Sequence, residues 1–196
     1  MKDYKLEFSL PLEALEEKKI SSTPIFDGKV LHVRLDEITL PNGKGAIREY
    51  CHHNGAVCVI PLTDEGEVIC VRQFRYPHGK VLLEIPAGKL DSKEEDRPSA
   101  ALRELQEETG ARCKHLIPLG QLLTTPAFVD EVIDMYLAEG LTFGDTNPDE
   151  DEFLEVERIP LATLVKDILD GRVPDGKTQA AVLRVALMQK DSPCYR

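Results

Sequence analysis

The sequence predicts a mixed α/β fold of the α+β kind, in which helices flank a mixed sheet and a small antiparallel β domain precedes it. Up to about position 85, apolar and β-branched residues form short strand-like runs, and from about 96 to 110 the apolar period becomes helical. The 196 residues, 42% of them hydrophobic, suffice for one substantial core and a small appendage. We therefore expect an N-terminal β domain at residues 1–50 and a main domain at residues 51–196.

The strands are expected mainly in the first half of the chain. In the N-terminal domain, two strand-like segments, 29–40 and 46–52, flank the turn Pro41-Asn42-Gly43-Lys44-Gly45 and predict an antiparallel hairpin. A second hairpin is expected around the turn Thr63-Asp64-Glu65-Gly66. The runs that predict strands of the main domain are 56–62, 68–74, 82–85, 132–138 and 155–159.

The first helix is expected between a cap at Asp96 and a cap at Gly110. Asp accepts hydrogen bonds from a helix N-terminus, and Gly adopts the left-handed conformation that ends a helix. Ala101, Leu102 and Leu105 fall at helical spacing, and we expect the acidic residues to face elsewhere.

Two further helices are expected at residues 161–170, ended by Gly171, and 178–188. Strands and helices follow no regular βαβ alternation, which favours a mixed sheet over a parallel one.

Composition excludes several classes of protein. The net charge of −11 argues against a protein that wraps nucleic acid, because neutralising phosphates takes clusters of Lys and Arg. The five cysteines are odd in number and include no Cys-x-x-Cys pair, which argues against a disulfide framework and a zinc site. The N-terminus lacks the apolar segment of a signal peptide, and no run approaches the roughly 18 apolar residues of a membrane span. We therefore expect a cytoplasmic protein that binds neither nucleic acid nor membrane.

Glu104, Glu107 and Glu108 are the most informative residues. They occupy positions i, i+3 and i+4 of the expected first helix, where side chains are neighbours and like charges repel. A divalent cation between them would remove the repulsion, and hard oxygen ligands without His or Cys suit Mg²⁺ or Mn²⁺. Taken alone, the same spacing is also typical of a solvated acidic helix face.

The surrounding residues resemble the Nudix box. This pattern is a glycine, five residues, a glutamate, seven residues, and then Arg-Glu-apolar-x-Glu-Glu-x-Gly-apolar. The matching residues are Gly88, Arg103, Glu104, Leu105, Glu107, Glu108, Gly110 and Ala111. The loop after Gly88 is one residue longer than the pattern, so its first glutamate is Glu94 counted forward or Glu95 counted back. We prefer Glu95, because the helix fixes its distance from Arg103.

The resemblance implies a magnesium site. Its ligands would be the carbonyl of Ala87 and the carboxylates of Glu104 and Glu108, while Glu107 would ligate or orient a metal-bound water. Gly88 would let the backbone turn sharply where the carbonyl approaches the metal. Arg103 would bridge an acid of the preceding loop and Glu107.

A second acidic run, residues 149–155, resembles the late loop that supplies the catalytic base and a further metal ligand in the ADP-ribose pyrophosphatases of this family. The resemblance places the base at Glu150 and the ligand at Glu152, to within one or two residues. A carboxylate can take the proton of a metal-bound water as the water attacks phosphorus. By itself, the run is also typical of a solvated loop.

Three further residues are expected to contact substrate. Arg72 and Arg75 are three apart and face opposite sides of a strand, and the resemblance assigns a diphosphate contact to Arg75. Arg48 matches another arginine that these enzymes use on substrate. Glu131 ends a segment that resembles the loop touching the distal ribose. For Arg75 or Arg48 taken alone, a surface salt bridge is an equally good interpretation.

The segment Gly171-Arg-Val-Pro-Asp-Gly-Lys-Thr178 satisfies the Walker A pattern letter for letter. A phosphate-binding loop follows a strand and opens a helix, whereas the residues before Gly171 have a helical period. Pro174 removes a backbone donor, and Asp175 would place negative charge beside phosphate. We therefore reject a phosphate-binding loop here.

Taken together, the resemblance implies a Mg²⁺-dependent Nudix hydrolase that cleaves the diphosphate of ADP-ribose or a related nucleoside diphosphate sugar. From ADP-ribose the products would be AMP and ribose 5-phosphate. It also implies an α/β/α sandwich and a homodimer whose exchanged N-terminal domains complete the substrate sites. A GDP-mannose or general nucleotide-sugar hydrolase is the enzyme alternative. A non-catalytic ADP-ribose sensor that regulates a partner is the alternative from another class, and the intact glutamates count against it.

Overall fold

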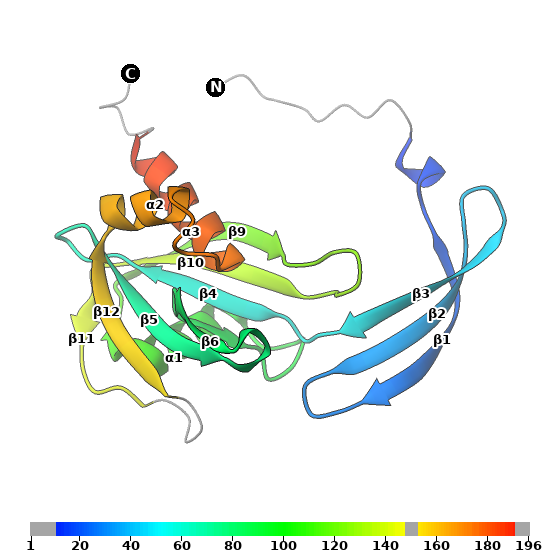
Figure 1. Ribbon diagram of the computed structural model, residues 1–196, viewed down its shortest axis with the longest axis horizontal. Coiled ribbons are helices and arrows are strands. Elements are labelled where there is room, and N and C mark those ends of the chain that lie inside the picture. The colour runs from blue at the N-terminus through cyan, green and yellow to red at the C-terminus, as the bar shows by residue number, and fades with distance from the viewer. Residues whose placement is uncertain (1–10, 148–152, 191–196) are drawn as a thin grey trace. The chain divides into compact units, whose positions relative to one another are not determined.

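The chain forms two compact units in the structure, a computed structural model that describes residues 11–147 and 153–190. The first unit runs to His53 and takes in Thr125–Asp130, and the second contains Asn54–Thr124 and the chain from Glu131 onward. Each unit has its own sheets (Figure 1).

The first unit is built on one three-stranded antiparallel sheet in the order β1-β2-β3. The 125–130 segment joins this unit through the backbone, where Cys51 N donates to Phe128 O at 2.8 Å. Asp130 adds a second anchor, because its carboxylate accepts a hydrogen bond of 2.6 Å from His53 N. The elements of the unit are η1 (Leu12–Ala14), β1 (Lys18–Asp27), β2 (His32–Thr39) and β3 (Gly45–His52).

Strand β1 has no counterpart among the predicted strands. The predicted hairpin of 29–40 and 46–52 corresponds to β2 and β3, which pair in antiparallel register. All ten residues of β1 are exposed. A strand with neither face buried needs no alternation of apolar and polar residues, so β1 carries no period-2 signal.

The second unit has a mixed central sheet in the order β7-β4-β10-β9, which confirms the predicted fold class. β4 and β10 run parallel, while β7 and β9 pair antiparallel with them. A second sheet has the order β12-β5-β6, and β8 pairs with β11. The elements are β4 (Ala56–Pro61), β5 (Glu67–Arg75), η2 (Tyr76–His78), β6 (Lys80–Glu84), β7 (Ala87–Lys89), α1 (Arg97–Thr109), β8 (Ala111–Arg112), β9 (His115–Leu123), β10 (Val132–Glu139), β11 (Thr142–Phe143), β12 (Leu154–Pro160), α2 (Leu161–Leu169) and α3 (Gly176–Lys190).

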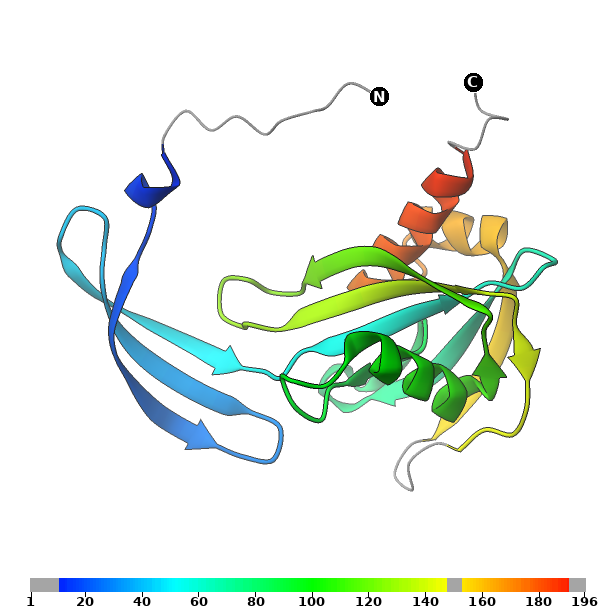
Figure 2. The same ribbon diagram turned by 180° about the vertical axis from the view of Figure 1, so that it is seen from behind.

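Alternate residues of β4 divide the core of this unit into two layers. Val57 and Val59 pack with side chains of α1, whereas Cys58 and Ile60 pack with side chains of α2, α3 and the β12-β5-β6 sheet. All four side chains are fully buried. Figures 1 and 2 show α1 on one side of the central sheet and α2 and α3 on the other. The central sheet therefore lies between two covering layers.

Helix α1 begins and ends where the sequence predicts. The side chain of Asp96 accepts a hydrogen bond of 3.0 Å from Ser99 N. Gly110 has a φ of 67°, and its N–H donates to Gln106 O. A Cβ at Gly110 would also lie 2.3 Å from Gly144 O, so both the backbone conformation and the available space require glycine there.

The predicted orientation of α1 is wrong in one respect. Glu104 and Glu108 are buried, with 8% and 4% of their surface exposed, while Leu102 is 42% exposed. At about 100° per residue, positions 104, 105 and 108 lie on one side of the helix and position 102 lies on another. The two acids therefore share the buried face with Leu105.

Strand β9 lacks a strand signal in the sequence because it contains Pro118 and Gly120. It is an edge strand of the central sheet, and its pairing with β10 shifts register between Gly120 and Pro118. Proline is tolerated at sheet edges and at bulges, where a ladder hydrogen bond is dispensable. Pairing with β10 in the tertiary structure is therefore the reason that this segment forms a strand.

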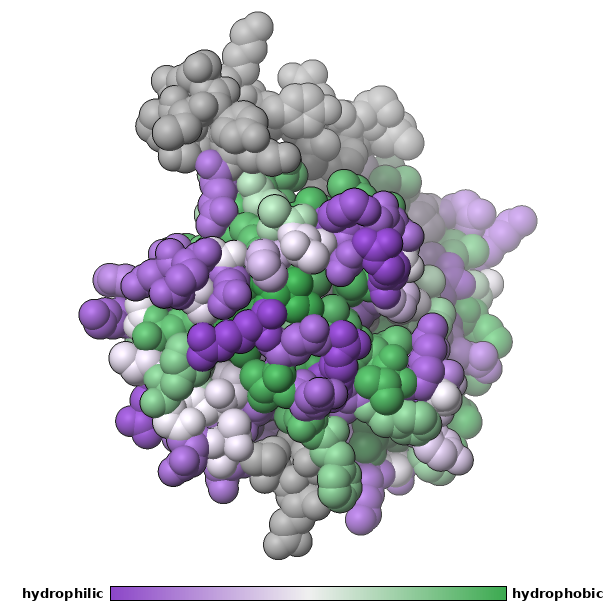
Figure 3. All heavy atoms as spheres, turned by 60° about the vertical axis from the view of Figure 1, so that its left-hand side comes forward, coloured by the Kyte–Doolittle hydropathy of each residue, from purple (hydrophilic) through white to green (hydrophobic). Residues whose placement is uncertain are grey.

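The face shown in Figure 3 carries hydrophobic side chains singly or in small groups, interspersed with hydrophilic ones. Among the described residues, no helix is both long enough and apolar enough to span a membrane.

The buried face of α1 generates a stability prediction. Leu105 is fully buried against β4, so Leu105→Ala should lower the free energy of unfolding by about 3 kcal/mol through lost transfer energy and a residual cavity. Leu102→Ala, on the exposed side of the same helix, should cost less than about 1 kcal/mol. Urea unfolding of both variants checks the prediction, and equal losses would contradict the orientation of α1.

Candidate active site

Two buried carboxylates of α1 face strand β7. Glu104 and Glu108 are one helical turn apart, and the carboxylate of Glu108 accepts a hydrogen bond of 3.1 Å from Ala87 N. The backbone of β7 is fixed in turn by β4, because β7 pairs antiparallel with residues Ala56–Cys58. The helix, the strand and the central sheet therefore hold these two carboxylates in place.

Gly88 makes room for Glu104. A Cβ built on Gly88 would lie 2.0 Å from the Cδ and Oε1 atoms of Glu104, so any side chain at position 88 would displace that carboxylate. The sharp turn expected at this glycine is wrong, since Gly88 lies within β7 and pairs with Val57. Close packing of a carboxylate on the strand is the physical reason for the glycine.

Arg103 is the centre of a cluster of carboxylates. Its Nη1 donates to Glu104 at 2.7 Å and to Glu107 at 3.1 Å, and its Nη2 donates to Glu95 at 3.3 Å. Burial lowers the pKa of Arg103, but the charge of Glu104 and the hydrogen bond to Glu107 outweigh burial, so the pKa is raised. Arg103 therefore stays positively charged between its acidic neighbours.

The longer loop before α1 is held by Glu95. Its carboxylate accepts a hydrogen bond of 2.7 Å from Asp91 N and also contacts Arg103, whereas Glu94 is exposed. The extra residue is thus accommodated between Gly88 and the contact of Glu95 with Arg103, in agreement with the preference for Glu95.

A second charge cluster joins β5, β6 and α3. Glu84, the last residue of β6, is 1% exposed. Its carboxylate accepts two hydrogen bonds of 2.7 Å from Arg75 and another from Lys177. Bonding to Glu84 raises the pKa of Arg75, and the charges of Asp175 and Glu108 raise it further. The charge of Glu108 on α1 therefore contributes to the raised pKa of Arg75.

The Asp175–Thr178 turn is a helix cap and not a phosphate-binding loop. It follows α2, whose end is marked by Gly171 with a φ of 75°. The carboxylate of Asp175 accepts a hydrogen bond of 2.9 Å from Thr178 N and caps α3. The buried Thr178 hydroxyl accepts a hydrogen bond of 3.0 Å from Ile85 N. The structure thus confirms that the Walker A pattern has a different context here.

The remaining predicted residues belong to other parts of the chain than α1 and β7. Glu150 and Glu152 lie outside the described residues. Arg48 is in β3 of the first unit, where its Nε donates to Glu17 at 3.0 Å. Glu131 accepts a hydrogen bond of 2.9 Å from the Thr124 hydroxyl. Arg48 therefore forms the surface salt bridge that is the alternative to a substrate contact.

The donors present on α1 and β7 suit a hard cation. Glu104 and Glu108 supply carboxylate oxygens, and the backbone of Ala87, whose N–H contacts Glu108, supplies a carbonyl, so this donor set contains oxygen atoms without His or Cys. Within residues 11–147 and 153–190, no group of three or more His, Cys, Asp or Glu side chains is arranged to hold a metal ion. A site with two carboxylates and a carbonyl from these residues fits Mg²⁺, which keeps several of its waters.

The sequence interpretation missed Glu84 and Lys177. The available signal was a single acid within the apolar run Val81-Leu82-Leu83-Glu84-Ile85, since an acid in a buried strand requires a cationic partner. Nothing in the sequence named that partner, because Lys177 is 93 residues away.

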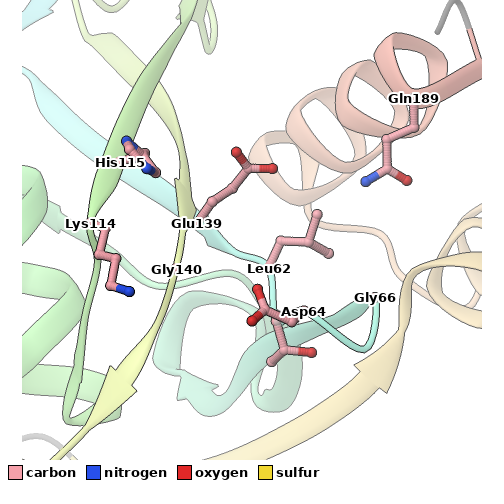
Figure 4. A pocket seen from close by; sticks show the side chains of 9 residues that line it. Leu62, Asp64, Gly66, Lys114, His115, Glu139, Gly140 and Gln189 are labelled. Atoms are coloured by element: carbon pink, nitrogen blue, oxygen red, sulfur yellow. The ribbon is translucent and has the colours of Figure 1, made fainter. Parts of the chain in front are cut away.

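A separate hollow of about 530 Å³ lies at the other end of β4 (Figure 4). Lys114 and His115 at the start of β9, Glu139 at the end of β10 and Gln189 of α3 line it. None of the residues of the two charge clusters borders this hollow.

The burial of Glu84 generates a pH prediction. Burial raises the pKa of Glu84, but the bonds from Arg75 and Lys177 outweigh it, so the pKa falls below its usual 4.5. A carboxylate with a lowered folded-state pKa stabilises the fold fully above its unfolded-state pKa, and this contribution is lost as pH falls through the folded-state value. Glu84→Gln should therefore lower the free energy of unfolding at neutral pH by about 3 kcal/mol.

The difference between the wild type and Glu84→Gln should shrink as the pH falls below the usual 4.5 of a glutamate. Urea unfolding of both proteins across acidic pH measures it. A difference that stays constant with pH would contradict a charged Glu84 in the folded state.

Comparison with known proteins agrees with this geometry. The family described as NUDIX domain matches residues 52–181, and the family described as nucleoside diphosphate sugar hydrolase N-terminal domain matches residues 17–50. An ADP-ribose pyrophosphatase of Bacillus subtilis (strain 168) is 42% identical over 180 residues, which cover 91% of this chain and 97% of that protein. A methanol dehydrogenase activator of Bacillus methanolicus is 41% identical over 176 residues, which cover 89% and 95%.

The fold is also shared with a solved structure. The crystal structure of an ADP compounds hydrolase has a TM-score of 0.76 to this chain at 23% sequence identity, covering 91% of this chain and 97% of that one. At this identity, the likeness bears on the fold alone. Because the NUDIX match covers most of the chain and includes α1, β7 and the loop between them, this protein belongs to the Nudix family of hydrolases.

Proposed function

We propose that this protein hydrolyses the diphosphate bond of ADP-ribose, giving AMP and ribose 5-phosphate. The observation that carries the proposal is the 42% identity, over nearly the full length of both chains, to a protein named ADP-ribose pyrophosphatase. The buried Glu104 and Glu108 packed on Ala87 and Gly88 support it, because the carboxylates that the reaction needs are present and held in place.

In the proposed site, the carboxylates of Glu104 and Glu108 and the carbonyl of Ala87 hold Mg²⁺, or Mn²⁺ in its place. Glu152 would add a further ligand from the late acidic run. When bound, such a cation neutralises diphosphate charge and lowers the pKa of a coordinated water. Arg103 holds Glu107 toward this site, where Glu107 ligates or orients a water.

The chemical step is attack of a water oxygen on one phosphorus of the diphosphate. The new phosphorus–oxygen bond forms as the bridging oxygen leaves with the other phosphate, and a carboxylate, which we assign to Glu150, takes the proton of the water. Arg75 binds the charged diphosphate oxygens through the edge of its guanidinium that Glu84 does not occupy. Arg48 and Glu131 are assigned to the rest of the substrate, Glu131 at the distal ribose.

The first unit is assigned to a homodimer. We propose that residues 1–50 form the N-terminal β domain, exchanged so that Arg48 serves the site of the partner subunit. The match of residues 17–50 to a nucleoside diphosphate sugar hydrolase N-terminal domain supports this assignment. The cysteines at 51, 58, 70 and 113 are free thiols, which agrees with a cytoplasmic location.

A second candidate function comes from the relative named methanol dehydrogenase activator. In this alternative, the chain acts on a dehydrogenase partner, either through hydrolysis or as a sensor that only binds. Adding the wild type and Glu104→Gln to a methanol dehydrogenase and following methanol oxidation distinguishes the cases. Activation by both proteins favours the sensor, and activation by the wild type alone favours the hydrolase.

The carboxylates generate the first functional prediction. Glu104→Gln, Glu108→Gln and Glu150→Gln should each lower kcat for ADP-ribose by about 100-fold or more, because each removes a negative charge needed for the metal or for proton transfer. Glu94→Gln is the matched control, since Glu94 is an exposed acid of the loop before α1 and its loss should leave kcat unchanged. Near wild-type turnover in both Glu104→Gln and Glu150→Gln, with Mg²⁺ present, would overturn the assignment.

Substrate choice is tested with the same protein. ADP-ribose, GDP-mannose, dinucleotides and nucleoside triphosphates are compared by kcat/KM with Mg²⁺. The highest value should be for ADP-ribose, and a higher value for GDP-mannose would make the protein a GDP-mannose hydrolase on the same scaffold.

The exchanged dimer predicts complementation between inactive variants. If Arg48 serves the partner's site, a mixed dimer of Arg48→Ala and Glu104→Gln subunits has one fully intact site. Unfolding and refolding an equal mixture should therefore restore about a quarter of wild-type activity, since half of the dimers are mixed and each has one good site. Activity no higher than the average of the two separate variants would refute the exchange.

A further inference from the structure

Glu84 joins two cations from distant parts of the chain. Its side chain is 2% exposed, whereas that of Arg75 is 38% exposed and that of Lys177 is 11% exposed. A buried carboxylate loses its hydration and is stabilised only by hydrogen bonds from charged partners. Arg75 and Lys177 provide those bonds, so the three side chains form one unit.

The two bonds to Arg75 fix the plane of its guanidinium. Nε donates to Oε1 and Nη2 donates to Oε2, both at 2.7 Å, in the bidentate geometry that sets orientation as well as distance. In the described part of the chain, Nη1 has no hydrogen-bond acceptor. The Nη1 edge of a partly exposed guanidinium is therefore the edge that remains for an anionic ligand.

Glu84 is itself anchored by α3. Lys177 bonds to Glu84 and also to Asp175 at 3.1 Å, and Asp175 caps the helix. The next residue of the β6–β7 connection, Ile85, is held by the Thr178 hydroxyl. Glu84 and Ile85, which precede Ala87 and Gly88 in the chain, are thus both attached to the first turn of α3.

We infer that Glu84 is a positioning residue for the hydrolysis. Glu84 orients the Nη1 edge of Arg75 toward the diphosphate, and the Asp175–Thr178 turn holds Glu84 in place. This inference rests on the proposed function, in which Arg75 contacts the diphosphate. An arginine has many rotamers, and the bidentate bond selects one of them before the substrate arrives. A lysine at position 75 would make no such bond, because its ammonium is a point charge without a fork.

A purely structural role for Glu84 is the competing explanation. In that case Glu84 would only secure α3 on β6, and its loss would affect the whole site regardless of Arg75. The two explanations differ in whether the effects of changing Glu84 and Arg75 on catalysis are independent.

A double-mutant cycle on kcat/KM for ADP-ribose with Mg²⁺ decides between them. Arg75→Ala alone and Glu84→Gln alone should each lower kcat/KM by about tenfold or more, as expected for loss of a charge-assisted contact. Adding Glu84→Gln to Arg75→Ala should lower it by no more than about twofold further, because the group that Glu84 orients is already absent. Additive losses, about 100-fold or more in total, would overturn the inference.

Glu84→Asp provides a second cycle in case Glu84→Gln folds poorly. It keeps the buried charge beside Lys177 but shortens the side chain, so the bidentate bond to Arg75 is lost first. Its loss of kcat/KM should also depend on Arg75, and an Arg75-independent loss would count against the inference. Asp167→Asn is the matched control, since it removes the charge from another arginine–carboxylate contact, in which Arg172 Nε donates to Asp167 of α2 at 3.0 Å, and it should leave kcat/KM unchanged.

The same cycle separates failure of the inference from failure of the proposed function. If the wild type turns over ADP-ribose and Arg75→Ala lowers kcat/KM, but the losses from the two variants add, only the inference about Glu84 is rejected. An Arg75→Ala variant with wild-type kcat/KM for every nucleotide sugar rejects the proposed diphosphate contact and the inference with it.

Discussion

The close approach of α1 to β7 is the contact on which the rest of the active site depends. The carboxyl of Glu104 occupies the space that a side chain at position 88 would fill, and the carboxyl of Glu108 accepts the N–H of Ala87. Leu105 anchors the same helix face in the core against β4. Apolar packing thus sets the distance at which two acids and one backbone segment meet.

Burying acids at this contact requires compensation, and the second unit provides it through two charge clusters. Arg103 is surrounded by the carboxylates of Glu95, Glu104 and Glu107, and Glu84 is surrounded by the cations of Arg75 and Lys177. The Arg103 cluster ties α1 to the loop before it, and the Glu84 cluster joins β5 and β6 to the distant α3. Groups held in this way do not have to reorient when a charged ligand binds, which is the property that electrostatic catalysis needs.

The Asp175–Thr178 turn illustrates how context decides the role of a motif. The letters of a phosphate-binding loop are present, but the turn follows a helix, and its polar groups already have protein partners. Asp175 bonds to Thr178 N and to Lys177, and Thr178 bonds to Ile85 N. The lysine that would bind phosphate in such a loop instead balances the charge of Glu84.

Local sequence alone determined α1, its caps at Asp96 and Gly110, the core strands and the spacing of Glu104, Glu107 and Glu108, because all of these depend on residues a few positions apart. The choice of Glu95 as the partner of Arg103 was also local, since the two residues are eight positions apart. Only the tertiary structure decided the burial of Glu104 and Glu108, the edge strand β9 with its Pro118, and the pairing of Glu84 with Lys177. These depend on which distant segments pack together, and the energy of a buried charge is set by partners that the linear sequence does not name.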